Sequence, residues 1–324
     1  MNRQKYAYRY SAAALVLLLS AVIAAGQQIV DPDFKPSVAN PGYTTKGPVV
    51  AIDEAHANFH TAGGQYKPFA DLLGLDGYRV KPGTRKFDKN AFAGIDVLVI
   101  ANALSDKATR ENPGLPAFTD AECDAVRDWV RDGGSLLLIS DHSPFGSAAE
   151  ELGKRFGVVM GKGWAYDRTE SGVTTQLVFS RENGLLGSHP ITQGRTPAEA
   201  VKLVRSFTGQ SLSVPAGATV LLKLSPTTRE APTNADVDVE QNEIRTQGAI
   251  GSHSTATTGR SQGLAMTFGK GRVVVLGEAG MFSAQIATLM NGDQKFDMKL
   301  GMNVDGTDDR QFALNIMHWL SKLE

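Results

Sequence analysis

Three short, almost wholly apolar runs constrain the fold more than any other feature of this chain. They occupy residues 48–53, 96–101 and 135–140, and Gly77–Val80 is a fourth candidate strand. Short runs that are apolar at nearly every position are typical of strands buried on both faces, as parallel strands covered by helices are. Helical patterns between these runs predict right-handed β-α-β crossovers and a mainly parallel sheet.

The helices of this pattern carry local start and stop signals. Thr119 and Glu122 form a capping box that opens a helix, and Gly133-Gly134 ends it. A helix is also predicted near Tyr66–Leu75, and another follows the strand at 135–140 and reaches Phe156. The chain closes with an amphipathic helix from about Asp308, whose apolar face contains Phe312, Ile316, Trp319, Leu320 and Leu323.

The second half of the chain has a different pattern. Residues from about 200 to 262 are predicted to form a β-rich insertion, in which residues 227–261 are polar and expected to be a long flexible excursion. Residues 263–277 contain two apolar runs around a Gly-Lys-Gly turn, which predicts a hairpin. We therefore expect one doubly wound α/β domain over residues 47–324, with this insertion inside it.

Composition excludes several classes of protein. The 324 residues include 33 basic and 34 acidic ones, and 42% are hydrophobic, so the chain is neither disordered nor a nucleic-acid binder that relies on a basic field. Only one stretch is continuously apolar, which excludes a polytopic membrane protein. Cys123 is the single cysteine, so an intramolecular disulfide cannot form, and its place in a predicted helix favours a buried, unreactive thiol.

The first 26 residues have the layout of a signal peptide. A basic segment that ends at Tyr10 precedes the apolar run 11–25, and small residues precede Gln27. We expect an exported protein, periplasmic or secreted, with no membrane segment beyond this one. Residues 27–46 are rich in Pro and Gly and are predicted to be an extended lead-in. An uncleaved N-terminal anchor is the alternative.

Candidate functional residues follow the predicted strands. Ligands bind beyond the carboxyl ends of the strands in open parallel sheets, so side chains at those positions carry most weight. Three segments qualify because each is rich in carboxylates or imidazoles. Their candidate residues are Asp53, Glu54, His56, His60, Asp141, His142 and Glu278.

These residue types leave three interpretations open. Asp53, His56, His60 and Asp141 could bind a divalent metal ion, since oxygen and nitrogen donors suit hard or borderline metals. Asp141, His142, Glu54 and Glu278 could instead supply an acid and a base without metal, with Asp141 as base, His142 as proton carrier and a glutamate activating water. The third interpretation is a hydrogen-bonded network that only ties strand ends together. Trp164 could wall a pocket or simply pack.

The segment WVRDGGSLLLISDHSPFGSAAEELGKRFGV resembles the strand, elbow and helix of class I glutamine-amidotransferase-like domains. That resemblance implies a flavodoxin-like arrangement, with a nucleophilic cysteine at the elbow. Here Asp141 occupies the elbow position, so a cysteine-dependent amidotransferase is not expected.

The chain also resembles a bacterial domain family without an established activity, related to gliding-motility-type auxiliary proteins of ABC transporters. DEAHANFH, VLVIAN, GGSLLLISDH, HPIT, GKGRVVVLGEAGMFSAQ and DDRQFALNIMHWL carry this resemblance. Fold alone does not give function, so two hypotheses remain. The first is an exported hydrolase acting on a small polar substrate. The second is a non-catalytic envelope module or transporter accessory that binds a sugar, a peptide or a protein.

Overall fold

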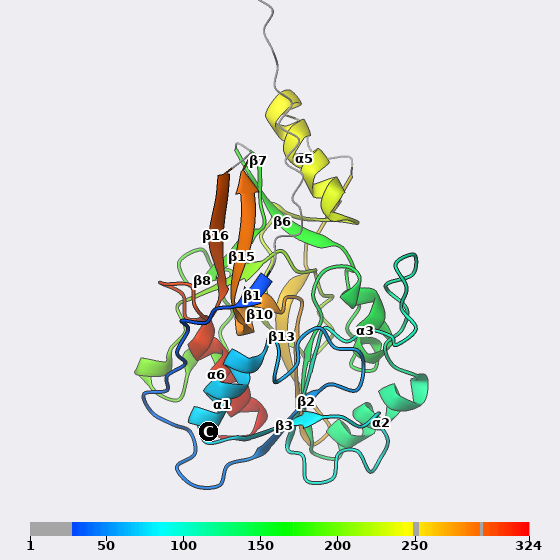
Figure 1. Ribbon diagram of the computed structural model, residues 1–324, viewed down its shortest axis with the longest axis vertical. Coiled ribbons are helices and arrows are strands. Elements are labelled where there is room, and N and C mark those ends of the chain that lie inside the picture. Colours follow the sequence, from blue (N-terminus) through cyan, green and yellow to red (C-terminus); the bar gives the residue numbers. More distant parts are fainter. Residues whose placement is uncertain (1–27, 171, 249–252, 292–293, 324) are drawn as a thin grey trace, which may run out of the picture.

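A seven-stranded sheet forms the centre of the protein (Figure 1). The computed structural model describes residues 28–170, 172–248, 253–291 and 294–323. Five adjacent strands of the sheet are parallel, and two antiparallel strands extend one edge. The strand order is β3 (Arg79–Gly83), β2 (Val49–Asp53), β4 (Val97–Ala101), β5 (Ser135–Ile139), β14 (Gly271–Leu276), β13 (Ser261–Phe268) and β10 (Thr219–Lys223). The prediction of an α/β fold with a mainly parallel sheet is confirmed, and so is the hairpin at 263–277.

The register of the inner parallel strands explains why the sequences of β2, β4 and β5 are almost wholly apolar, whereas the edge strand β3 is largely exposed. Successive residues of a strand point to opposite faces, and both faces of this sheet are covered. One row of paired residues faces one core and the next row faces the other. The first row is Ala51, Leu98, Leu136 and Val273, and the second is Ile52, Val99, Leu137 and Val274.

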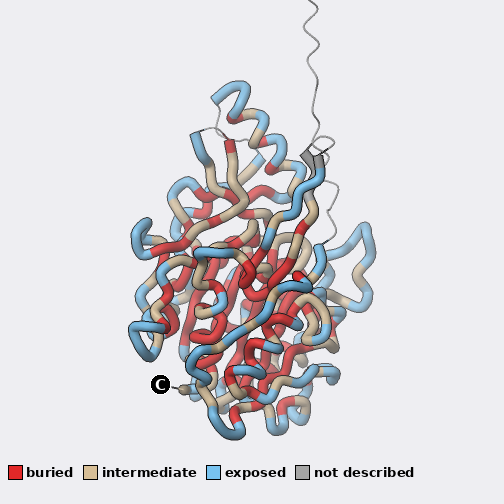
Figure 2. Tube along the Cα trace, turned by 60° about the vertical axis from the view of Figure 1, so that its left-hand side comes forward, coloured by how far each residue is buried: buried red, intermediate tan, exposed pale blue. Residues whose placement is uncertain are grey.

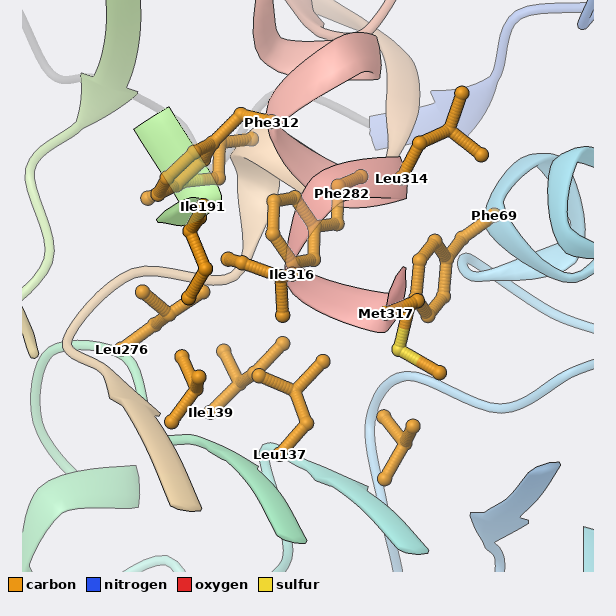
Figure 3. Packing of buried hydrophobic residues seen from close by; sticks show 14 of the residues in the cluster. Phe69, Leu137, Ile139, Ile191, Leu276, Phe282, Phe312, Leu314, Ile316 and Met317 are labelled. Carbon is orange, nitrogen blue, oxygen red and sulfur yellow. The ribbon is translucent and has the colours of Figure 1, made fainter. Parts of the chain in front are cut away.

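Helices cover both faces of the sheet. Helix α1 (Lys67–Leu75) and helix α6 (Asp309–Leu320) lie on one face, where Figure 3 shows Phe312, Ile316 and Met317 of α6 above Leu137 and Leu276. Helices α2 (Asp120–Arg131) and α3 (Phe145–Lys154) lie on the other face. The predicted capping box of α2 is present, and Cys123 is buried.

Three smaller antiparallel sheets lie outside the central one, and several of their strands project at one end of the molecule in Figure 1. In Figure 2, exposed residues lie around the periphery of the molecule, including this end, and buried residues fill its centre. Strand β1 (Gln28–Val30) belongs to the extended lead-in and pairs with β15. The other strands are β6 (Trp164–Thr169), β7 (Gly172–Thr174), β8 (Gln176–Ser180), β9 (Leu203–Phe207), β11 (Thr228–Ala231), β12 (Thr255–Ala256), β15 (Ala284–Asn291) and β16 (Gln294–Gly301).

The predicted flexible excursion at 227–261 is wrong in part, because it contains a helix. Helix α5 (Asn234–Gln247) begins after a capping box between Thr233 and Asp236. Only a narrow stripe of the helix is apolar and buried, including Val237 and Ile244. So small an apolar stripe gives a weak periodic signal, which is why composition favoured a loop.

Two predictions concern the N-terminal region and membranes. The predicted signal peptide at 1–26 lies outside the described residues. Across the described part of the chain, every helix is too short or too polar to cross a membrane.

The short helix α4 (Pro190–Gln193) packs against α6.

Candidate functional site

A cavity of about 630 Å³ lies where four parallel strands end. Residues that follow β2, β4, β5 and β14 line it, together with residues of β1, β6, β9, β15, β16 and the first residue of α5. Its polar lining includes His60, Asn102, Asp141, His142, Glu278 and Gln285. Its aromatic lining consists of Phe59, Phe145, Trp164 and Phe207. The carboxyl edge of the sheet therefore carries the pocket that the strand pattern predicted.

Asn102 links two of these strand ends. It follows β4 directly and has a φ of 48°, a left-handed conformation that asparagine tolerates better than most residues. Its Oδ1 accepts a hydrogen bond from the backbone N–H of Asp141 at 2.9 Å, so its Nδ2 is the donor toward Nδ1 of His60 at 3.2 Å. His60 therefore accepts at Nδ1 and holds its proton on Nε2. Burial lowers the pKa of His60 to about 3, which keeps the ring neutral.

Two carboxyl groups face the cavity from neighbouring strands. Asp141 follows β5 and accepts hydrogen bonds from the backbone N–H groups of His142 at 2.7 Å and Ala279 at 3.4 Å. Glu278 follows β14 and is 1% exposed. Burial and then the charge of Asp141 raise the pKa of Glu278 well above its ordinary value. The site thus holds two carboxyl groups in unlike environments, and that of Glu278 favours the protonated form.

His142 stacks on Trp164. Their ring centroids are 3.5 Å apart and the planes are inclined by 17°. Nδ1 of His142 lies 2.8 Å from the carbonyl oxygen of Ser143, which can only accept, so Nδ1 carries the proton. Its Nε2 lies 3.9 Å from Oδ1 of Asp141, and His142 lines the cavity.

The structure places Asp53 and His56 away from this cavity, which corrects the sequence prediction. Nδ1 of His56 lies 2.9 Å from Oδ2 of Asp53, and its Nε2 lies 3.1 Å from Oε1 of Glu122 on α2. The His56 ring packs between Phe87 and Phe118. Asp53 lies two residues after Ala51 on β2 and so faces the core on the α2 side, where His56 binds it.

Glu54 does not line the cavity either. Its Oε1 accepts a hydrogen bond from the backbone N–H of Ala62 at 2.9 Å and so stabilises the loop after β2. The four predicted metal ligands are thus divided, with Asp53 and His56 on one side and His60 and Asp141 on the other. Among the described residues, no group of three or more His, Cys, Asp or Glu side chains is arranged to hold a metal ion.

Sequence reasoning missed Asn102 and gave too little weight to the aromatic wall. Asn102 had a usable signal, since it is the first residue after an apolar strand. Trp164 lies on β6, and no local pattern shows that β6 borders the cavity. Phe59 lies between His56 and His60 in the sequence, lines the cavity and is 51% exposed.

Comparison with solved structures supports the fold. A structure described as "mmIFT52 N-terminal domain" superposes with a TM-score of 0.54 at 13% identity, covering 84% of this chain and 97% of that chain. At so low an identity, this similarity concerns the fold alone. The sequence matches no family model and no curated protein.

Two further similarities are more distant. A putative ThuA-like protein from Bacteroides uniformis has a TM-score of 0.41 at 13% identity and covers 88% of this chain and 94% of its own. A putative GMP synthase component from Thermoplasma acidophilum has a TM-score of 0.40 at 12% identity, with 85% and 95% covered.

Proposed function

We propose that this cavity hydrolyses a small polar substrate by acid–base chemistry, with Asp141, His142 and Glu278 as catalytic residues. The observation that carries the proposal is the pairing of unlike carboxyl groups. Glu278 is buried, and burial and then the charge of Asp141 raise its pKa, whereas Asp141 accepts two backbone hydrogen bonds at the neighbouring strand end. Pairs of carboxyl groups whose environments separate their acidities supply an acid and a base at one pH.

The chemical step assigns one proton transfer to each side of the reacting bond. A water molecule attacks the electrophilic centre and gives a proton to Asp141, directly or through Nε2 of His142. As the new bond to the water oxygen forms, the bond to the leaving group breaks. Glu278 gives its proton to the leaving group and becomes a carboxylate. Proton exchange between the two carboxyl groups and solvent then restores the starting state.

A non-catalytic binding module is the second candidate. Both oxygens of Glu278 already accept backbone hydrogen bonds, from Gly280 at 2.5 Å and Met281 at 2.9 Å. In this second candidate, Glu278 has a purely structural role and shapes the loop after β14. On this alternative the cavity binds its ligand and leaves it unchanged.

We further propose that the fold is flavodoxin-like and that the protein is exported. The five parallel strands follow the order 2-1-3-4-5 when they are numbered along the chain, which is the flavodoxin-like order. This order supports the proposed kinship with glutamine-amidotransferase-like domains. Export to the periplasm or the medium rests on the pattern of residues 1–26.

A screen of chromogenic substrates tests the hydrolysis. The purified protein is assayed against nitrophenyl glycosides, esters and phosphates, beside the variants Asp141→Asn and Glu151→Gln. Glu151 is a control because it pairs with Lys154 on the surface of α3. We expect cleavage by the wild type, a loss of at least about 100-fold in Asp141→Asn and no change in Glu151→Gln. Absence of cleavage across the panel, or full activity of Asp141→Asn, would favour the binding module.

A further inference from the structure

The charge of the cavity lining restricts which ligands it can hold. Asp141 supplies a carboxylate, and none of the described residues that line the cavity is a lysine or an arginine. Sites for phosphates and carboxylates use arginine, lysine or clustered backbone N–H groups to balance the ligand's charge. An anionic ligand would meet the Asp141 carboxylate here without such compensation. The lining thus favours a neutral ligand or a cation.

The rest of the lining combines flat apolar surfaces with planar polar groups. His142 and Trp164 form a stacked pair, and Phe59 exposes half of its side chain at the cavity. The amide groups come from Gln28, Asn102, Asn234 and Gln285. Each amide contains both a donor and an acceptor, as a hydroxyl group does. The Asn102 amide is already bonded to Asp141 and His60, so Gln28, Asn234 and the oxygen of Gln285 remain for a ligand. A cation would need only the aromatic faces and the carboxylate, and these further amide groups favour a ligand with hydroxyl groups.

Two buried polar atoms of lining residues have no hydrogen-bond partner. They are Nε2 of His60, which holds the proton, and Oε1 of Gln285, whose amide nitrogen donates to Ser283 at 2.7 Å. One is a donor and the other an acceptor, and a buried polar atom without a partner costs stability. The half-exposed ring of Phe59 lies 5.2 Å from the ring of His60, and the buried ring of Tyr66 lies 4.6 Å from it.

We propose that the ligand is a neutral polyhydroxylated ring, a monosaccharide or cyclitol unit, which in a substrate carries the bond to the leaving group. Its apolar face packs on the His142–Trp164 pair, and its hydroxyl groups bind Asp141, Nε2 of His60 and Oε1 of Gln285. This inference rests on the proposed function in that it places the ligand in the same cavity. It adds the substrate class and assigns His60 and Gln285 as specificity-determining residues.

Binding to the wild-type full chain tests the class without any substitution. The probes are neutral hexoses, pentoses and myo-inositol, their deoxy analogues, glucuronate as an anion, and choline as an organic cation. Each is used up to about 10 mM, the range of weak binding, with calorimetry and tryptophan fluorescence as readouts. We expect at least one neutral polyol to bind, and its deoxy analogues and glucuronate to bind about tenfold more weakly or worse. Binding of choline without any polyol, no polyol binding at all, or equal affinity for every deoxy analogue would overturn the proposal.

Variants of the two unpartnered groups test the residue assignment. Gln285→Leu removes the acceptor, and we expect about a tenfold loss of affinity, with no change for Gln193→Leu on the exposed surface of α4. His60→Phe removes the donor, whereas His60→Gln keeps an N–H group and should restore part of the binding. Unchanged affinity in both Gln285→Leu and His60→Phe would overturn the assignment.

The two proposals fail in different ways. Binding of a neutral polyol, together with no cleavage of nitrophenyl glycosides or esters of that same ring, contradicts the hydrolysis and leaves the ligand class intact. Cleavage of a nitrophenyl ester that depends on Asp141, without binding of any polyol, contradicts the ligand class and leaves the hydrolysis intact.

Discussion

Nδ1 of His56 lies 2.9 Å from Oδ2 of Asp53, and both side chains are fully buried. Glu122 binds the other ring nitrogen, so the imidazole joins the strand end of β2 to helix α2. No side of this ring is left for a substrate, because Phe87 and Phe118 pack against its faces. The DEAHANFH segment thus contains one histidine that holds the fold together and one, His60, that faces the cavity.

His56→Ala should therefore lower stability and spare ligand binding. The substitution leaves the buried Asp53 carboxylate without its partner, and we expect the free energy of unfolding to fall by about 3 kcal/mol. Urea denaturation measures the loss. His253→Ala is the control, since this histidine is 45% exposed and should shift stability by no more than about 0.5 kcal/mol. A stable His56→Ala protein that no longer binds its ligand would contradict this assignment.

Asn102→Gly should weaken the site without straining the backbone. Glycine accepts the positive φ at this position, so the change isolates the lost hydrogen bonds to His60 and Asp141. We expect a loss of about 2 kcal/mol in unfolding free energy, because two buried groups lose partners. Asn90→Gly, at an exposed turn, is the matched control. Equal stability of the two variants would show that the Asn102 bridge is not needed.

Asp309 should make the protein less stable as the pH rises. Burial raises the pKa of this carboxyl from 3.8 to about 8, so the folded chain binds a proton that the unfolded chain releases. The stabilisation is complete below pH 3.8 and is lost as the pH rises through about 8. In Asp309→Asn the unfolding free energy should decline less between about pH 5 and about pH 9. Asp305→Asn, an exposed control, should follow the wild type, and identical slopes in all three proteins would disprove the role of Asp309.

Local patterns were sufficient for the central sheet and for most helices. Strands β2, β4 and β5 are buried on both faces, so their sequences carry an unambiguous apolar signal. The closing helix shows the limit. Two of its polar residues, Asn315 and His318, are buried as well. Hydrogen bonds compensate for their burial, since His318 lies 2.6 Å from Asp76 and Asn315 donates to the carbonyl oxygens of Ile191 and Glu199. These partners come from distant segments, and periodicity within the helix does not contain them.

The site was predictable to the level of strand ends but not to the level of side-chain direction. Asp141, His142 and Glu278 directly follow or come soon after their strands, so the sheet topology alone brings them together. Asp53 is the last residue of β2 itself, and its side chain points into the core. Because Asp53 lies two residues after Ala51 on β2, strand alternation turns its side chain to the core on the α2 side, and His56 binds it there.

The role of Glu278 as the acid gives the most direct test of the account. Glu278→Gln is compared with the wild type on two substrates of the same class, one with a nitrophenol leaving group and one with an alkyl alcohol. Nitrophenolate leaves without a proton, whereas an alkoxide needs one. We predict a loss of at least about 100-fold in turnover for the alcohol substrate and a much smaller loss for the nitrophenyl substrate. Equal losses on both substrates, or none on either, would contradict the proposed acid–base pair.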